Sequence, residues 1–198
     1  MPTFLLVAHD APTHAEFPLD DLPGAGGRMD LLARCVIDAL LTSHGIREDT
    51  RLHVVVGDDL TVRFDGATLR NLHPDERSAA ALLRTALAAR EDAIGHQPAE
   101  PSPGLSLVKM GLETTLAILD DEGTLVRLGP DGVPAAETSP PDDPIFVLSD
   151  HRPFGDDELA RIGERADRTV SLGPVGLHAN QAITVAHNWL DTDGFAAY

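Results

Sequence analysis

Short apolar runs alternate with longer amphipathic stretches along this chain, and the alternation predicts its fold class. Stretches with helical periodicity separate five apolar runs that have the length and polar boundaries of buried strands. These runs are residues 3–9, 51–58, 104–110, 144–150 and 168–173. Strands that alternate with helices predict an α/β fold with a mostly parallel sheet flanked by helices.

The helical stretches carry boundary signals. Residues 28–45 present one apolar face, and Gly45 is the predicted stop. The stretch 73–93 begins with Pro74 in its predicted first turn, next to Asp75, an acid that the helix dipole favours there. Further helices are predicted at 155–167 and 179–190. A helix is also predicted at 111–123, where half of a hairpin is the alternative, whereas 61–72 and 124–134 are predicted to be small extended or hairpin excursions.

The hydrophobic pattern gives no reason to divide the chain into more than one domain. The Pro-rich connections 94–104 and 135–144 are too short to separate independent cores, so one domain is predicted over residues 1–198. No apolar run reaches the ~18 residues that a membrane span needs, and the first residues lack the basic region of a signal peptide. Cys35 is the only cysteine, which excludes a disulfide within the chain. We expect a soluble, cytoplasmic protein.

The charge balance changes which partners are plausible. The chain has 32 acidic and 15 basic residues, a net charge of −17, and Lys109 is its only lysine. Such a surface is typical of proteins from a salt-loaded cytoplasm, although an ordinary acidic protein is the alternative. Acidity normally argues against nucleic acid as a partner. At molar salt the Debye length falls to roughly 3 Å, and that exclusion loses most of its force.

Candidate chemistry gathers where the last strands end. The strand 144–150 runs into "LSDHRPFG", the strand 168–173 into "SLGPVGL", and the last helix opens with "HANQAI". Ligands bind at the carboxyl ends of parallel strands, and glycines and helix N-termini offer backbone groups to them. We therefore predict a backbone-lined slot with apolar walls. The chain has no G-x-G-x-x-G, P-loop or nucleophile elbow, so this is not a common nucleotide or hydrolase site.

The same segments carry a resemblance. "FVLSDH", "SLGP" and "LHANQAI" resemble, in order and spacing, the three cofactor loops of the knotted SPOUT methyltransferases. "NLHPDERSAA" (71–80) narrows the resemblance to the archaeal tRNA (pseudouridine-54 N1)-methyltransferases, over essentially the whole chain. Some relatives carry a cysteine where this chain has Ala182; a backbone contact to the cofactor survives that change, whereas a thiol role does not.

The resemblance implies a SPOUT fold with a deep trefoil knot over roughly 144–198, a homodimer, and tRNA as the partner. The turn-forming residues before the last helix then serve the knot and the cofactor. That helix is expected to pack on the partner subunit, although its apolar stripe also fits an ordinary core. S-adenosylmethionine is the implied methyl donor, and the residues implied to hold it are Leu148, Ser149, Asp150, Ser171, Leu172, Gly173, Leu177 and Ala182.

Methyl transfer to N1 of pseudouridine requires removal of the N1 proton, so a base is needed. Asp75 is the first candidate for this base, with Arg77 beside it as a phosphate ligand. A helix cap and a structural ion pair are the alternative roles of this pair. Asp150 is the second candidate for the base, and its alternative role is hydrogen bonding within the cofactor loop.

Other polar residues complete the expectations. His9, Asp10 and His14 come nearest to metal-ligand spacing, but loop or substrate-rim roles fit them better, and no metal is predicted. RNA must be bound by arginines, which grip phosphates and stack on bases. The candidates outside the predicted core stripes are Arg28, Arg63, Arg70, Arg77 and Arg152. Neither DNA nor a membrane is an expected partner.

Two other functions stay open at this stage. One is a knotted methyltransferase that modifies a different RNA position, or a ribose 2′-oxygen. The other is a non-catalytic α/β module that binds an adenine nucleotide, which predicts binding of ATP or AMP in preference to S-adenosylmethionine. The missing phosphate-binding glycine loop argues against the second.

Overall fold

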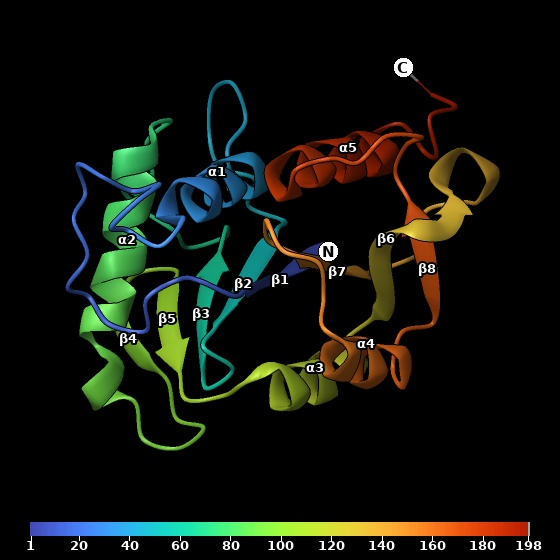
Figure 1. Cartoon of the computed structure of the whole chain (residues 1–198). Coiled ribbons are helices and arrows are strands. Elements are labelled where there is room, and N and C mark those ends of the chain that lie inside the picture. Colours follow the sequence, from blue (N-terminus) through green and yellow to red (C-terminus); the bar gives the residue numbers. More distant parts are fainter. Residues whose placement is uncertain (198) are drawn as a thin grey trace.

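The strands form one sheet in the order β4–β5–β3–β2–β1–β7–β6–β8, as the computed structural model shows for residues 1–197 (Figure 1). Strands β1, β2, β6, β7 and β8 are parallel to their neighbours in this group, whereas β3, β5 and β4 continue the sheet in antiparallel fashion. The strands are β1 (Thr3–Ala8), β2 (Arg51–Val56), β3 (Leu60–Asp65), β4 (Ala99–Ser102), β5 (Leu105–Val108), β6 (Thr124–Pro134), β7 (Pro144–Ser149) and β8 (Arg168–Ser171).

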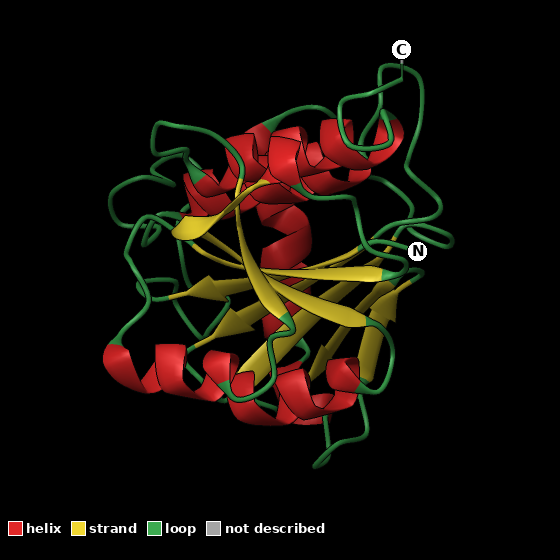
Figure 2. Cartoon of the chain, turned by 90° about the vertical axis from the view of Figure 1, so that its right-hand side faces the viewer, coloured by secondary structure: helices red, strands yellow, loops and turns green. Residues whose placement is uncertain are grey.

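Helices cover both faces of the sheet and make a three-layer structure (Figure 2). Helices α1 (Met29–Leu40), α2 (Glu76–Ala88) and α5 (Ala179–Asp191) cover one face, and α3 (Leu112–Asp120) and α4 (Asp156–Gly163) the other. Successive side chains of a strand point to opposite faces. Phe4 and Leu6 of β1 accordingly join the core under α1, α2 and α5, whereas Leu5 and Val7 join the core under α3 and α4. The mostly parallel α/β fold is confirmed.

Two segments predicted as excursions are strands of the sheet. The segment 124–134 contains β6, which pairs with both β7 and β8. The segment 61–72 lies partly in β3, which pairs with β2 through a tight turn. The hairpin predicted at 61–72 is thereby confirmed, whereas 124–134 was wrongly placed outside the main sheet because Arg127 interrupts its apolar run. Since β6 has a partner on each side, its position depends on contacts distant in sequence.

Helix boundaries differ from the predictions at two points. Helix α1 ends at Leu40 instead of Gly45, because Leu41 pairs with Ile46 in an antiparallel bridge and the chain turns back. Pro74 lies before helix α2, whose N-cap is Asp75. The helix predicted over 111–123 is confirmed as α3.

Helix α5 packs its apolar stripe within its own chain. Ile183, Ala186 and Trp189 are fully buried in the core beneath α1. His187 on the same helix lies 3.0 Å from the carbonyl oxygen of Ala39 in α1 and packs edge-on against the ring of Phe4. Of the two roles considered for this stripe, the structure shows the ordinary core. No helix among residues 1–197 is long and apolar enough to cross a membrane.

Candidate active site

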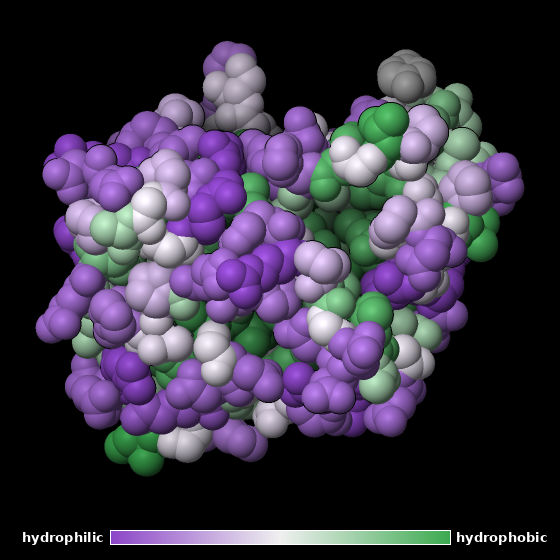
Figure 3. Space-filling view, in the orientation of Figure 1, coloured by the Kyte–Doolittle hydropathy of each residue, from purple (hydrophilic) through white to green (hydrophobic). Residues whose placement is uncertain are grey.

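A cavity of about 790 Å³ opens where β6, β7 and β8 end and helix α5 begins. Three loops line it: residues 148–154 after β7, 171–177 after β8, and 127–131 within β6. The space-filling view shows apolar surface inside a hollow on the right of the molecule, surrounded by polar surface (Figure 3). Because the carboxyl ends of parallel strands meet at one edge of the sheet, segments distant in sequence converge here.

The structure places every residue implied for the cofactor on the wall of this cavity. They come from three separate parts of the chain, which the parallel pairing of β7, β6 and β8 brings together. The residues are Leu148, Ser149, Asp150, Ser171, Leu172, Gly173, Leu177 and Ala182.

One wall of the cavity was missed by sequence reasoning. Residues Arg127–Asp131 of β6 line it, and Arg127 there is held by Thr169 at 3.2 Å and by Asp131 at 2.6 Å. A signal for this wall was present in the sequence. "LGP" follows the apolar run of β6 at 128–130, as it follows that of β8 at 172–174.

The 173–177 wall of the cavity has exposed apolar side chains and backbone amides without backbone partners. Val175 is 69% exposed and Leu177 36% exposed, although both are apolar and both line the cavity. Covering such side chains releases roughly 25 cal/mol per Å² of apolar surface. Within the part of the chain that the structure describes, no backbone amide from Gly173 to Leu177 donates to a backbone acceptor. The cavity therefore suits a ligand with an apolar face and a hydrogen-bonding edge.

A network around Asp150 fixes the loop after β7. The Asp150 carboxylate, only 3% exposed, accepts hydrogen bonds from the backbone amide of His9 (2.8 Å), from its ring Nδ1 (2.8 Å) and from the backbone amide of Arg152 (2.9 Å). The other ring nitrogen of His9 lies 3.1 Å from Glu158 of α4. Burial lowers the pKa of His9, but the hydrogen bonds with Glu158 and Asp150 outweigh it and raise the pKa above its usual 6.5.

The loop after β1 belongs to the same network. Asp10 lies 3.0 Å from Nε2 of His151 and 2.8 Å from the guanidinium of Arg152. His9 and Asp10 thus bind the loop after β7 directly. Among residues 1–197, no group of three or more His, Cys, Asp or Glu side chains could hold a metal ion.

A second chain of ion pairs starts where α1 begins. Gly27 and Arg28 both have positive φ, and a Cβ at Gly27 would lie 2.6 Å from the carbonyl oxygen of Asp10. The buried Asp30 pairs with Arg28 (3.0 Å) and Arg34 (2.7 Å). Burial raises the pKa of Asp30, but these two arginines outweigh burial and lower it.

This chain of ion pairs extends from α1 to α2. Its member Arg34 also pairs with Glu76, the first residue of α2. The pKa of Arg28 is raised mainly by its hydrogen bond to Asp30, and also by the charge of Asp150 at the cavity. Ion pairs therefore hold the start of α2 to the start of α1, whereas Asp150 acts on Arg28 only through its charge.

Asp75 and Arg77 lie outside the cavity. The Asp75 carboxylate caps α2 by accepting a hydrogen bond from the backbone amide of Ser78 at 2.8 Å, and it is exposed. Arg77 is exposed on the first turn of α2 and makes no ion pair among residues 1–197. The structure brings this pair to the surface at the start of α2 and not to the cofactor loops.

The candidate RNA-binding arginines do not form one cluster. Arg152 lines the cavity beside Asp10, and Arg28 is engaged by Asp30. Arg70 donates to the carbonyl oxygen of Leu69. Arg63 lines a second cavity on another part of the sheet.

The sequence of residues 1–195 matches the model of the family described as "Putative SAM-dependent RNA methyltransferase". The chain belongs to this family. The resemblance seen in the cofactor loops is thereby confirmed. A cavity of about 790 Å³ is within the range of roughly 300–1,000 Å³ in which cofactors of this size bind. Its apolar walls and free amides fit the adenine and ribose of S-adenosylmethionine, the methyl donor of this family.

Two related proteins match this chain over its full length, and one solved structure shares its fold. The tRNA (pseudouridine(54)-N(1))-methyltransferase of Haloarcula marismortui is 57% identical over 198 residues, which covers all of both chains. The enzyme of the same name from Haloferax volcanii is 54% identical with the same coverage. Nep1 of Archaeoglobus fulgidus, solved bound to S-adenosylhomocysteine, shares the fold, with a TM-score of 0.61 at 14% identity over 92% of this chain and 93% of that one.

Proposed function

We propose that this protein transfers a methyl group from S-adenosylmethionine to N1 of pseudouridine at position 54 of tRNA. The cavity at the ends of β6, β7 and β8 carries this proposal, because its lining is built from the loops that resemble the cofactor loops of such enzymes. Relatives that bear this name and match the chain from end to end support it.

S-adenosylmethionine, when bound, supplies a methyl group activated on a sulfonium sulfur. The task of the protein is to hold the acceptor in line with that group. Such positioning can lower a barrier by as much as ~7–11 kcal/mol. Leu148, Leu172 and Leu177 provide apolar walls, and the network of His9 and Asp150 holds the first cofactor loop in place. A prearranged loop avoids reorganisation during the reaction.

The acceptor atom explains the choice of substrate. In uridine, N1 carries the glycosidic bond, whereas in pseudouridine that bond is to carbon and N1 carries a removable proton. Asp75 is our proposed base and Arg77 its phosphate-binding neighbour. Asp150 is less suited to this role, since its carboxylate already accepts hydrogen bonds from His9 and Arg152. The ion pairs Arg28–Asp30–Arg34–Glu76 hold the start of α2, and with it Asp75, against α1.

Four further features follow from the same proposal. They are a single domain over residues 1–198, a trefoil knot over roughly 144–198, a homodimer, and a cytoplasmic location at high salt. The net charge of −17 and the relatives from Haloarcula and Haloferax support the last of these. Light scattering in concentrated potassium chloride tests the dimer, because its mass is twice that of the 21.1 kDa chain.

Methyl transfer to two otherwise identical tRNAs tests the function. One tRNA carries pseudouridine at position 54 and the other uridine, and the donor is labelled S-adenosylmethionine in concentrated potassium chloride. Label in the pseudouridine tRNA alone supports the proposal. Equal label in both points to a ribose 2′-oxygen or another base atom, and binding of ATP in preference to S-adenosylmethionine points to a nucleotide-binding module.

A further inference from the structure

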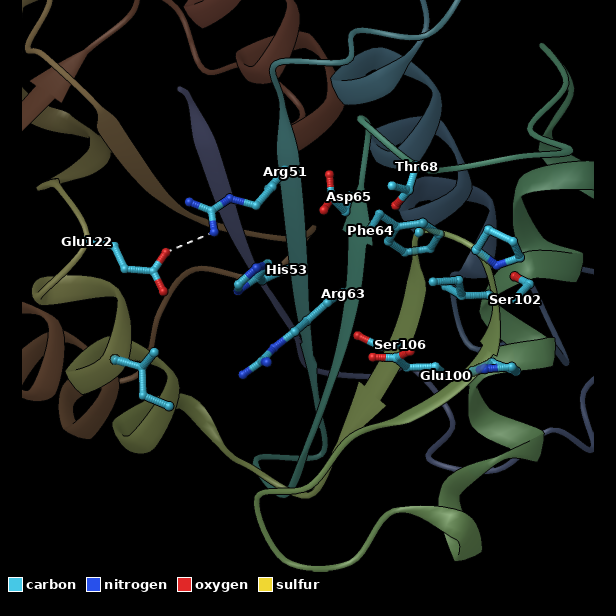
Figure 4. A pocket seen from close by; sticks show the side chains of 15 residues that line it. Arg51, His53, Arg63, Phe64, Asp65, Thr68, Glu100, Ser102, Ser106 and Glu122 are labelled. Carbon is cyan, nitrogen blue, oxygen red and sulfur yellow. Dashed lines mark ion pairs between the residues drawn. The ribbon is translucent and has the colours of Figure 1, made fainter.

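A second cavity, of about 670 Å³, lies on the sheet away from the cofactor loops. We name it the β2–β3 cavity; strands β2, β3, β4 and β5 and helix α3 line it (Figure 4). It lies on the face that carries α3 and α4, beyond the edge of α3. Because helix α3 ends there, side chains of the antiparallel strands face solvent on this side.

Polar side chains stand in a row across these strands. His53 of β2 pairs in register with Arg63 of β3, which pairs with Ser106 of β5. Arg51 of β2 pairs in register with Asp65 of β3, two residues along. The residues between them, on the opposite face, are apolar and fully buried, as the strand period of two requires: Leu52, Val54, Val62 and Phe64. The row is therefore a built feature of a half-covered sheet.

Arg63 supplies a positive charge to the cavity. It is half-buried and makes no ion pair among residues 1–197, whereas Arg51 pairs with Glu122 at 2.9 Å. Burial lowers the pKa of Arg63 from its usual value; the charge of Glu122 opposes this effect and that of Arg51 adds to it. Two further acids of the lining make no ion pair with Arg63: Asp65 accepts from the backbone amide of Ala67, and Glu100 is exposed.

Polar atoms without partners lie in the wall of the same cavity. Four buried side-chain atoms of the lining have no hydrogen-bond partner within residues 1–197: Arg51 Nε, His53 Nδ1, Arg63 Nε and Ser102 Oγ. His53 is only 7% exposed, and Figure 4 shows its ring between Arg51 and Arg63. Burial, and then the charges of Arg63 and Arg51, lower the pKa of His53 to about 3, so its ring is neutral. Buried polar groups of folded proteins are nearly always bonded, so this concentration indicates a ligand.

We propose that the β2–β3 cavity binds a phosphate group in the backbone of the RNA substrate, an inference that rests on the proposed function. A phosphate diester carries one negative charge, which suits Arg63, the lining arginine without an ion pair among residues 1–197, and several acceptor oxygens, which match polar groups on three different strands. A guanidinium fork suits phosphate geometry.

The position of the cavity suits an extended polyanion. Arg165, which follows α4, pairs with Glu113 of α3 at 2.9 Å. Helix α4 contributes Leu159 to the cofactor cavity, and α3 contributes Ile118 to the β2–β3 cavity. Double-stranded nucleic acid carries a charge about every 1.7 Å of its axis. An RNA arm whose base reaches the cofactor cavity therefore carries many further phosphates, and the proposal requires that one of them reach the β2–β3 cavity.

Binding of tRNA to Arg63→Gln provides the first test. We expect about tenfold weaker binding than wild type, and a slope of log affinity against log salt that is smaller by about one. Arg84→Gln is the matched control: it removes the same charge from an arginine of α2 that lines neither cavity and makes no ion pair among residues 1–197. Wild-type affinity in Arg63→Gln, or equal weakening in both variants, overturns the proposal. Partial recovery in Arg63→Lys supports a charge-dependent contact.

Inorganic phosphate and the ring nitrogens of His53 provide a second test that needs neither tRNA nor activity. We expect saturable NMR shifts of the His53 nitrogens in wild type and none in Arg63→Gln. Shifts in wild type together with unchanged tRNA binding by Arg63→Gln overturn the RNA assignment and point to a free phosphate compound. The proposed function fails if wild type does not transfer a methyl group. Neither binding measurement depends on that result, so the two failures can be told apart.

Discussion

The carboxylate of Asp150 accepts hydrogen bonds from both the backbone amide and the ring Nδ1 of His9, each at 2.8 Å. The two residues are 141 positions apart in sequence. They meet because β1 and β7 are parallel neighbours, so both strands end at the same edge of the sheet. The first loop of the cofactor cavity is thus held by the strand at the centre of the fold.

His9 makes the stability of this loop depend on pH. Protonated His9 donates to Asp150 and Glu158, and its pKa in the folded protein is raised above 6.5. A raised pKa adds stability that is complete below pH 6.5 and is lost as the pH rises through the folded value. We expect urea unfolding in concentrated salt to show wild type losing stability as the pH rises above 6.5, and His9→Asn losing much less.

His151→Asn is the control for this prediction, because His151 lies in the same network but contacts Asp10. The stability of His151→Asn should decline as the pH rises above 6.5, as that of wild type does. If His9→Asn and wild type lose stability in parallel, the ion pairs of His9 do not contribute as described.

Ala182 tests whether the cofactor occupies the cavity at the ends of β6, β7 and β8. It lies half-buried on the cavity wall in the first turns of α5. Ala182→Leu should fill part of the cavity and weaken binding of S-adenosylhomocysteine more than about tenfold, measured by calorimetry, while the protein still unfolds cooperatively. Thr184→Leu, exposed on the same helix, should bind as wild type does. Unchanged affinity in Ala182→Leu would place the cofactor elsewhere.

Two substitutions at Asp75 separate its proposed chemistry from its capping role. Asparagine caps a helix about as well as aspartate but is no base. Asp75→Asn should therefore lower methyl transfer by about 10²–10⁴-fold with little change in stability. Asp75→Ala should in addition cost about 1 kcal/mol, because Ser78 loses its hydrogen-bond acceptor. Wild-type turnover in Asp75→Asn assigns the base to another residue.

His187 sets part of the resistance to acid. Burial, with a smaller effect of Arg47, lowers its pKa to about 4 in the folded protein. A lowered pKa adds stability that is present above pH 6.5 and is lost as the pH falls toward 4, by about 3 kcal/mol for this shift. His187→Gln keeps a donor for the carbonyl of Ala39 and should lose less stability over this range.

The exposed His44 supplies the control for His187. His44→Gln should follow wild type between pH 6.5 and 4 when unfolding is measured at each pH. A residual loss is expected in every variant, because His53 also has a lowered pKa, about 3. A wild-type pH dependence in His187→Gln contradicts the prediction.

Local pattern predicted much of this molecule because apolar spacing reports burial directly. The strands β1, β2, β5, β7 and β8 and all five helices were found from that spacing. It failed for β6, where Arg127 and Gly129 interrupt the apolar run, and for β4, which lies in the segment 94–104 that was predicted to be a Pro-rich connection. It also placed the end of α1 at Gly45, since the bridge between Leu41 and Ile46 leaves no mark in a helical period.

The sequence by itself determined the α/β class, the loops that line the cofactor cavity, and Asp75 at the start of a helix. These depend on side-chain period, turn chemistry and short motifs, which are local. Only the tertiary structure decided that β6 separates β7 from β8, that His9 binds Asp150, and that Arg63 stands beside His53 in a cavity. Each of these depends on which strands become neighbours, and that choice is made by burial across the whole sheet, which no short stretch of sequence encodes.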